Sequence, residues 1–377
     1  MDAFSIFNAL GKFSESVNKP PVSLLEERCV HKQHNQATCD RCISACPTHA
    51  FELADGQMTL VAEDCVRCGY CVHACPTGAI VGQTESDKLL KRVAQHTDTS
   101  RLELACAYRS TPKIMADPQA TLFVAPRCLA ALSLSTYVEL ANQGVTHLSV
   151  RGDACADCPI GQLAAQIQET AANAQQLTAS HPVMTIDVIT ELPADSPPVR
   201  SIQDTNQHRV SRRGLFQMFT QVNETQAAES HESAYPPTLP PEHQRLLTAL
   251  ESRPDAPSTW ASSLTVDGDC SACQVCVRIC PTRALVMEVG RKTFRLSLDA
   301  AYCTGCGLCT AGCPENVLYV DTQAEPDTTA MTMLTVGEIR ECKRCKTIFS
   351  GGSDLCPACA FRRKNPFGSR MLVNMEG

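Results

Sequence analysis

The sequence predicts an α+β protein in which cysteine-rich units flank a small α/β domain with a parallel sheet. The 377 residues include 24 cysteines, which fall into four groups along the chain. Hydrophobic residues make up 44 % and charged residues 19 %, so the chain can bury cores and is not disordered as a whole. A chain this rich in cysteine is either a disulfide-rich secreted protein or a metal protein.

The N-terminal residues favour the metal protein. Residues 1–25 do not show a basic segment followed by an apolar one, which a secretory signal requires. No uncharged apolar stretch reaches the length of about 18 residues that a transmembrane helix needs. We therefore expect a cytoplasmic protein whose thiols bind metals. The net charge of −7 argues against a general nucleic-acid binder.

One cysteine spacing occurs repeatedly. The run Cys65-x2-Cys68-x2-Cys71-x3-Cys75-Pro76 recurs from Cys270 to Pro281 and from Cys303 to Pro314, and an imperfect copy runs from Cys39 to Pro47. These runs resemble those of bacterial two-cluster [4Fe–4S] ferredoxins, in which three thiolates of a run hold one cluster and the fourth reaches the other cluster. Proline is tolerated after the fourth cysteine because the first helical turn has no intrahelical partner for its N–H.

The resemblance implies two pairs of [4Fe–4S] clusters, hence four in all. In the second pair, over about 265–322, apolar stretches at 285–287 and 294–298 flank Gly290 as in a hairpin. The implied ligands of this pair are Cys270, Cys273, Cys276 and Cys313 for one cluster, and Cys303, Cys306, Cys309 and Cys280 for the other.

The first pair departs from the pattern at one position. Gln36 stands where the first cysteine of the first run is expected, and Cys29 is the nearest replacement because loop closure costs little extra for a longer loop. His31 and His34 lie in this longer loop, either solvated or with one of them replacing Cys29 and raising the cluster potential. The implied ligands are Cys29, Cys39, Cys42 and Cys75 for one cluster, and Cys65, Cys68, Cys71 and Cys46 for the other.

The pattern in the middle of the chain predicts a small α/β domain. Strand-like runs at 101–105, 121–125, 146–150 and 184–189 alternate with helical periodicity at 129–143 and 160–178. Four cysteines follow the first three strands: Cys106, Cys128, Cys155 and Cys158. Loops after parallel strands meet at one sheet edge, so these cysteines predict a metal site there.

This middle pattern loosely resembles the cysteine-rich α/β modules of electron-bifurcating and hydrogenase-associated subunits. The resemblance implies a fifth iron–sulfur cluster, of [2Fe–2S] or [4Fe–4S] type. The alternative is a domain without a cofactor whose thiols pack in its core.

The last four cysteines form two knuckles. The spacing Cys342-x2-Cys345-x10-Cys356-x2-Cys359 can close one tetrahedral site and resembles a short zinc ribbon, which implies one zinc ion. A rubredoxin-type iron site is the alternative. The basic residues that follow either dock an acidic partner or are simply solvated: Arg362, Arg363, Lys364 and Arg370.

A proline-rich segment separates the two halves. Residues 191–262 carry nine of the 23 prolines and predict a linker without continuous helix or sheet. Within it, Ser211-Arg212-Arg213-Gly214-Leu215-Phe216 looks like an internal twin-arginine motif. Together with the downstream runs, residues 209–320 resemble the ferredoxin-type accessory proteins of periplasmic nitrate reductase. The motif could dock a partner through Arg212, Arg213, Leu215 and Phe216, or form an ordinary surface helix.

The predicted fold is thus two two-cluster ferredoxin-like domains flanking a small α/β domain, plus a C-terminal zinc-ribbon-like knuckle. The expected segments are an N-terminal helix or extension (1–25), a ferredoxin-like domain (26–82), the α/β domain (83–190), the linker (191–262), a second ferredoxin-like domain (263–325), and the knuckle with its basic tail (335–377).

The expected function is electron transfer. Such a protein relays single electrons to or from a larger redox enzyme or its electron-transfer subunit, with formate dehydrogenase, nitrate reductase and hydrogenase as candidates by resemblance. We find no complete catalytic constellation and assign no catalytic residue. The alternatives are an accessory factor that helps such an enzyme mature, and a redox enzyme whose active site is the middle group of cysteines.

Overall fold

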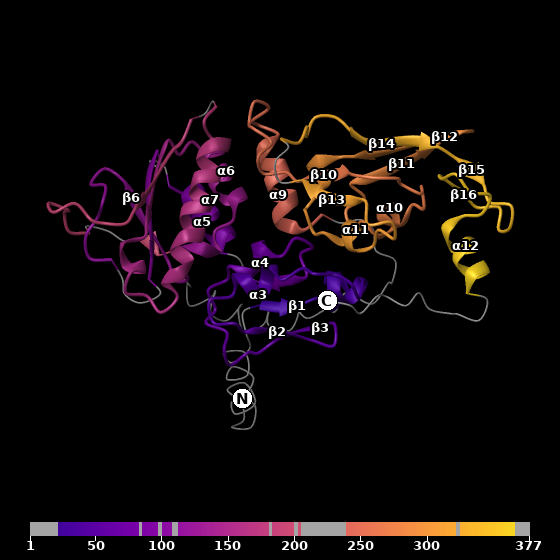
Figure 1. Cartoon of the computed structure of the whole chain (residues 1–377). Coiled ribbons are helices and arrows are strands. Elements are labelled where there is room, and N and C mark those ends of the chain that lie inside the picture. The colour runs from indigo at the N-terminus through magenta and orange to yellow at the C-terminus, as the bar shows by residue number, and fades with distance from the viewer. Residues whose placement is uncertain are drawn as a thin grey trace, which may run out of the picture. The chain divides into compact units, whose positions relative to one another are not determined.

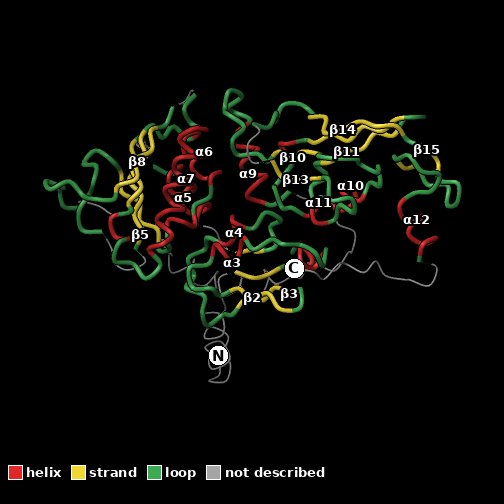
Figure 2. Tube along the Cα trace, viewed as in Figure 1, coloured by secondary structure: helices red, strands yellow, loops and turns green. Residues whose placement is uncertain are grey.

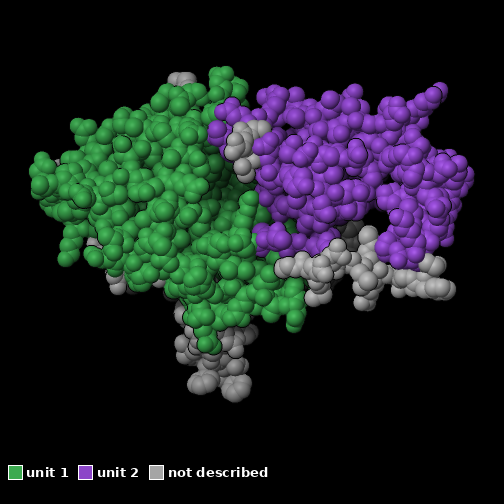
Figure 3. Space-filling view, viewed as in Figure 1, with its two compact units in different colours: residues 1–32, 40–257 green, residues 33–39, 258–377 purple. Residues whose placement is uncertain are grey.

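The computed structural model describes residues 22–82, 85–96, 100–107, 112–180, 183–199, 203–204, 239–321 and 325–365. The chain forms two compact units, coloured separately in Figure 3: residues 1–32 with 40–257, and residues 33–39 with 258–377. Each unit contains hydrophobic cores of its own. In the described part of the chain, no helix is both long and apolar enough to cross a membrane.

The first unit begins with two small antiparallel sheets and short helices. Its elements are β1 (Val22–Leu24), η1 (Glu26–Arg28), α2 (Val30–Gln33), α3 (Arg41–Ala45), β2 (Phe51–Ala54), β3 (Gln57–Leu60), α4 (Cys71–Ala74) and β4 (Ile80–Gly82). Strand β1 pairs with β4, so this part starts before the expected boundary at residue 26. Strands β2 and β3 join through Asp55 and Gly56, whose positive φ angles suit a tight hairpin.

The α/β part contains one sheet of five parallel strands in the order β8-β7-β5-β6-β9. The predicted parallel sheet is confirmed, and its first four members match the expected strands within one residue at either end. The two-residue β9 was not predicted. The strands are β5 (Arg101–Cys106), β6 (Thr121–Ala125), β7 (His147–Arg151), β8 (Thr185–Ile189) and β9 (Gln203–Asp204).

Helices cover one face of this sheet (Figure 1, Figure 2). The connections from β6 to β7 and from β7 to β8 run in the same direction, so their right-handed crossovers put α6 and α7 on one side. The step from β5 to β6 runs the opposite way, which creates a switch point where α/β proteins bind ligands. The helical elements are α5 (Glu85–Ala94), η2 (Leu129–Ala131), α6 (Leu134–Asn142), η3 (Asp153–Cys155), η4 (Gly161–Leu163) and α7 (Ala164–Leu177).

A helix inside the expected linker corrects the prediction for residues 191–262. Helix α9 (Pro241–Leu250) belongs to the first unit and packs on α6. Pro240 and Pro241 occupy its N-cap and first position, where proline does not disturb helical hydrogen bonds, so here the prolines begin a helix. The Asn142 side chain donates a hydrogen bond of 2.8 Å to the Ala249 carbonyl.

The second unit is built around an antiparallel hairpin. Strand β11 pairs with β12 as predicted, and β14 adds a third strand on the other side of β12. Its buried core includes Leu285, Leu296 and Leu298. The elements are β10 (Ser263–Val266), α10 (Val275–Ile279), β11 (Leu285–Val289), β12 (Thr293–Leu298), η5 (Ala300–Tyr302), α11 (Leu308–Ala311), β13 (Leu318–Asp321) and β14 (Thr332–Glu338).

The C-terminal knuckle consists of β15 (Arg340–Glu341), β16 (Ile348–Phe349) and α12 (Pro357–Lys364). Its Ser350 N–H donates to the Ser271 carbonyl at 3.0 Å. Ser271 directly follows Cys270, so the knuckle is anchored to the first cysteine run of this unit.

We predict that Leu246→Ala detaches α9 from α6. Leu246 is only 7 % exposed, and removing a buried leucine side chain costs about 2–5 kcal/mol. Amide hydrogen exchange in α9 and on α6 should become faster, whereas Thr248→Ala, at an exposed position of the same helix, should leave it unchanged. Equal exchange in both variants would show that α9 does not pack as described.

Candidate metal centres

The three complete cysteine runs share one backbone conformation. In each run, the residue before the second cysteine and the residue after it have positive φ angles: Arg67 and Gly69, Ala272 and Gln274, Gly305 and Gly307. For a residue other than glycine this conformation costs about 1–2 kcal/mol. These turns are needed because they bring the successive thiols of a run to the same side of the loop. Within the described residues 39–46, the imperfect copy has no positive φ angle.

The segments after the fourth cysteines are alike as well. The third residue beyond each has a positive φ angle: His49, Gly78, Arg283 and Asn316. In the first two copies the next N–H donates to the cysteine sulfur, from Ala50 to Cys46 Sγ and from Ala79 to Cys75 Sγ, both at 3.2 Å. Hydrogen bonds to sulfur are among the factors that set the potential of an iron–sulfur centre.

In the second unit, eight thiols gather into two groups. The Cys276 group lines one small cavity and comprises Cys270, Cys273, Cys276 and Cys313. The Cys309 group lines another and comprises Cys280, Cys303, Cys306 and Cys309. Burial, together with the charges of neighbouring thiolates, raises the pKa of both Cys276 and Cys309 to about 12. Each group thus contains three thiols of one run and the fourth thiol of the other.

The first unit contains a third such group, the Cys68 group: Cys46, Cys65, Cys68 and Cys71. Burial raises the pKa of Cys71, and the charges of the other three thiolates raise it too, so the four lie close together. Cys68 and Cys71 are 7 % and 8 % exposed.

The fourth expected group, the Cys42 group, comprises Cys29, Cys39, Cys42 and Cys75. Cys29, Cys42 and Cys75 pack against the same small core, and Cys42 Sγ lies 3.8 Å from Met58 Sδ. In the nearby loop, Nδ1 of His34 accepts the Gln36 N–H at 3.3 Å.

The middle group, Cys106, Cys128, Cys155 and Cys158, lines a cavity of about 410 Å³ at the carboxyl edge of the parallel sheet. Burial raises the pKa of Cys128 to about 12, and the thiolates of Cys106, Cys68 and Cys155 contribute. The remaining wall of the cavity is largely apolar and includes Ile114, Leu129, Ile160, Leu163, Ile167 and Leu192.

A buried ion pair holds one side of this cavity. Glu103 in β5 is fully buried, and Nη1 of Arg151 donates to its Oε1 at 2.9 Å. Arg151 also donates to the Ile114 carbonyl at 2.9 Å and to Asp153. Burial alone would lower the pKa of Arg151, but its hydrogen bonds to Asp153 and Glu103 outweigh this and raise it.

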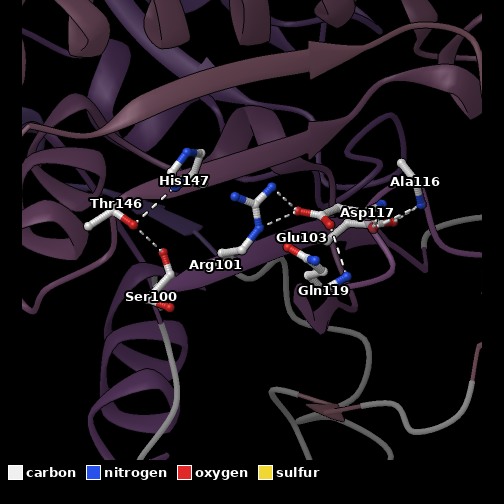
Figure 4. Close-up of polar contacts among 8 residues, drawn as sticks. All are labelled: Ser100, Arg101, Glu103, Ala116, Asp117, Gln119, Thr146 and His147. Atoms are coloured by element: carbon white, nitrogen blue, oxygen red, sulfur yellow. Dashed lines mark hydrogen bonds and ion pairs between the residues drawn. The ribbon is translucent and has the colours of Figure 1, made fainter.

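The same glutamate fixes the residues that follow Ile114, which lines the cavity. Glu103 Oε2 accepts the N–H groups of Ala116 and Asp117, both at 2.9 Å. Figure 4 shows this contact beside the Arg101–Asp117 ion pair, whose closest N–O distance is 2.6 Å. Sequence reasoning missed this network, although an acidic residue inside the apolar run RLELA was a signal of it.

The C-terminal group differs from the others in size. The sulfurs of Cys342, Cys345, Cys356 and Cys359 all lie within 4.8 Å of one another. A tetrahedral zinc site with Zn–S bonds of about 2.3 Å places its sulfurs about 3.8 Å apart, so this group fits a single ion. Desolvation would raise the pKa of Cys342, but hydrogen bonds from the N–H groups of Cys345, Cys356 and Arg344 lower it to about 6.

The larger groups fit a different occupant. In the described part of the chain, only the C-terminal group brings its ligand atoms within single-ion distance. Four thiols spaced more widely around a cavity suit a polynuclear cluster, whose irons each bind one thiolate. The buried hydroxyls of Ser271 and Thr310, which adjoin Cys270 and Cys309, have no partner among the described atoms and could donate to cluster sulfur.

Two expected docking elements are only partly described. The linker motif with Arg212, Arg213, Leu215 and Phe216 lies outside the described residues, as does Arg370. The basic residues Arg362, Arg363 and Lys364 are exposed at the end of α12.

Comparison with known families identifies two segments of the chain. Residues 269–317 match a model of the 4Fe-4S dicluster domain, and residues 37–80 match a second model of the same description. The first match spans the Cys276 and Cys309 groups, and the second spans the Cys68 group and all of the Cys42 group except Cys29. No curated protein matches the chain as a whole or in part.

We predict that Glu103→Ala opens the segment around Ala116. The substitution removes the acceptor of the Ala116 and Asp117 N–H groups and one of the two carboxylates that pair with Arg151, which keeps its ion pair with Asp153. Leaving a buried donor without an acceptor costs about 1–3 kcal/mol. Hydrogen exchange at the Ala116 and Asp117 amides should accelerate strongly. Arg101→Gln breaks the more exposed ion pair with Asp117, which is worth about 0–1 kcal/mol, and should change exchange far less. Similar exchange in the two variants would contradict the network.

Proposed function

We propose that this protein transfers single electrons through four [4Fe–4S] clusters to or from a larger redox enzyme or its electron-transfer subunit. Two 4Fe-4S dicluster domains are the observation that carries the proposal. The Cys276, Cys309 and Cys68 groups would each hold one cluster. Cys29, Cys39, Cys42 and Cys75 would hold the fourth. Each cluster supplies reversible one-electron chemistry, and the protein sets its potential by hydrogen bonds and burial.

We further propose a fifth iron–sulfur cluster on the middle group and one zinc ion on the C-terminal group. The convergence of loops after β5, β6 and β7 on a common cavity supports the first. The close spacing of four sulfurs supports the second. A fragment as small as the knuckle depends on its metal for stability, so the zinc would be structural.

The class of the partner rests on resemblance alone. Formate dehydrogenase, nitrate reductase and hydrogenase types remain our candidates, and we place the exchange in the cytoplasm. An accessory factor that helps such an enzyme mature is the alternative. An experiment with the partner enzyme distinguishes the two functions. A carrier is reduced or oxidised by the complete enzyme, whereas a maturation factor binds the enzyme only before its cofactor is inserted.

One observation favours a second candidate function. The middle cavity, at about 410 Å³, is far larger than the cavities of about 20 Å³ at the Cys276 and Cys309 groups. Its apolar wall leaves room for a small molecule beside the thiols. In this case the protein would be a redox enzyme with its active site at the middle group, and turnover of a small substrate would be lost in Cys155→Ala.

We predict the iron content from the proposed clusters. Four [4Fe–4S] clusters contain about 16 iron atoms, and a fifth centre adds about two to four. Protein purified without oxygen should therefore contain about 16–20 iron atoms per chain, with paramagnetic resonance signals of reduced clusters. Fewer than about 12 iron atoms after reconstitution would contradict the assignment of two cluster pairs.

We predict that Cys345→Ala removes zinc and leaves iron in place. The wild-type chain should contain about one zinc ion, because four thiolates complete a structural site. Metal analysis of both proteins measures this directly. Lys346→Ala, which changes the exposed neighbour of Cys345, serves as the control and should keep its zinc. Iron in place of zinc at this site in cytosol-derived protein would favour the rubredoxin-type alternative.

A further inference from the structure

Cys68 differs from the other thiols of the dicluster domains in where it is buried. It belongs to the main core of the α/β part of the first unit, together with Cys128 of the middle group. Each of these two cysteines is 7 % exposed.

The chain segments beside these two cysteines are in direct contact. Gly69 has a φ angle of +83°, and a Cβ atom added to it would lie 3.1 Å from Cβ of Ala131. His73 Nε2 donates to the Ala130 carbonyl at 2.7 Å, since a carbonyl can only accept. Ala130 and Ala131 lie in η2, which begins immediately after Cys128. The cysteine run that contains Cys68 therefore packs against the loop that contains Cys128.

Two further hydrogen bonds surround this contact. Tyr70 Oη donates to Gln166 Oε1 of α7 at 2.7 Å. Gln162 Nε2 donates to the Pro47 carbonyl at 2.9 Å, and Pro47 directly follows Cys46 of the Cys68 group. The contacts therefore involve both chain segments that supply the Cys68 group, which fixes that group against the α/β part.

We propose that residues 65–75 and 128–132 form an electron-transfer junction between the Cys68 group and the middle group. This inference rests on the proposed function, because it requires a cluster at each group. Among the centres of the first unit, it makes the Cys68 group the one that exchanges electrons with the middle cavity. The exchange moves one electron: one centre is oxidised as the other is reduced, and no bond is made or broken.

The junction can be tested by magnetic interaction between the two centres in the full-length protein. In reduced wild type, the electron spin of one N-terminal cluster should relax faster because a paramagnetic centre lies beside it. Cys155→Ala/Cys158→Ala removes two ligands of the middle group that are outside residues 65–75 and 128–132. This variant should lose the iron of the middle centre and the fast relaxation, while retaining the iron of the dicluster domains.

A matched pair of glycine substitutions tests the contact itself. Gly69→Ala adds a Cβ against Ala131, whereas Gly56→Ala adds one at a similar φ angle of +73° with no atom within 4 Å. The strain of a positive φ angle is thus comparable in both. Gly69→Ala should weaken the interaction at unchanged iron content, and Gly56→Ala should preserve it.

The outcomes separate the junction from the proposed function. Equal iron in wild type and in Cys155→Ala/Cys158→Ala would mean that the middle group holds no cluster, which overturns the fifth centre and the junction with it. Full iron in wild type with relaxation that Cys155→Ala/Cys158→Ala leaves unchanged would overturn the junction alone. If Gly69→Ala fails to assemble its clusters, the cysteine variant still decides.

Discussion

The structure depends on one constraint: several thiols must converge on one small volume. A run of cysteines two residues apart can do this only if the backbone turns sharply between them, and the positive φ angles of Arg67, Ala272 and Gln274 show the strain that this requires. The gathered thiols are also buried, which disfavours the thiolate form that binds metal. Bound metal ions would offset the cost of the strained backbone and would stabilise the buried thiolates. Folding of these segments and metal binding should therefore be coupled.

The chain gathers sulfur in two different ways. In the dicluster domains, short runs do so by local turns, and each fourth cysteine comes from the neighbouring run. In the α/β part, the ligands are far apart in sequence and meet because parallel strands end at one edge of the sheet. This second way needs a rigid frame, and the buried Glu103–Arg151 pair helps to provide it by joining β5, β7 and residues 114–117.

This difference explains what could be predicted from the sequence. The groups of the second unit were predictable because their geometry is encoded within a few residues, and the parallel sheet was predictable from alternating patterns. Helix α9 was not, because its prolines suggested a linker and only packing on α6 reveals their role as a helix start.

The contact between the Cys68 and Cys128 loops could not be read from spacing either, because it joins residues that are some sixty positions apart. Its chemistry suits electron transfer. His73 donates to the Ala130 carbonyl and Tyr70 donates to the Gln166 side chain, so polar groups of both loops are held at fixed positions. Preorganised dipoles of this kind need little rearrangement when charge moves past them. A junction held by such contacts would therefore add little rearrangement cost to electron exchange between the two sites.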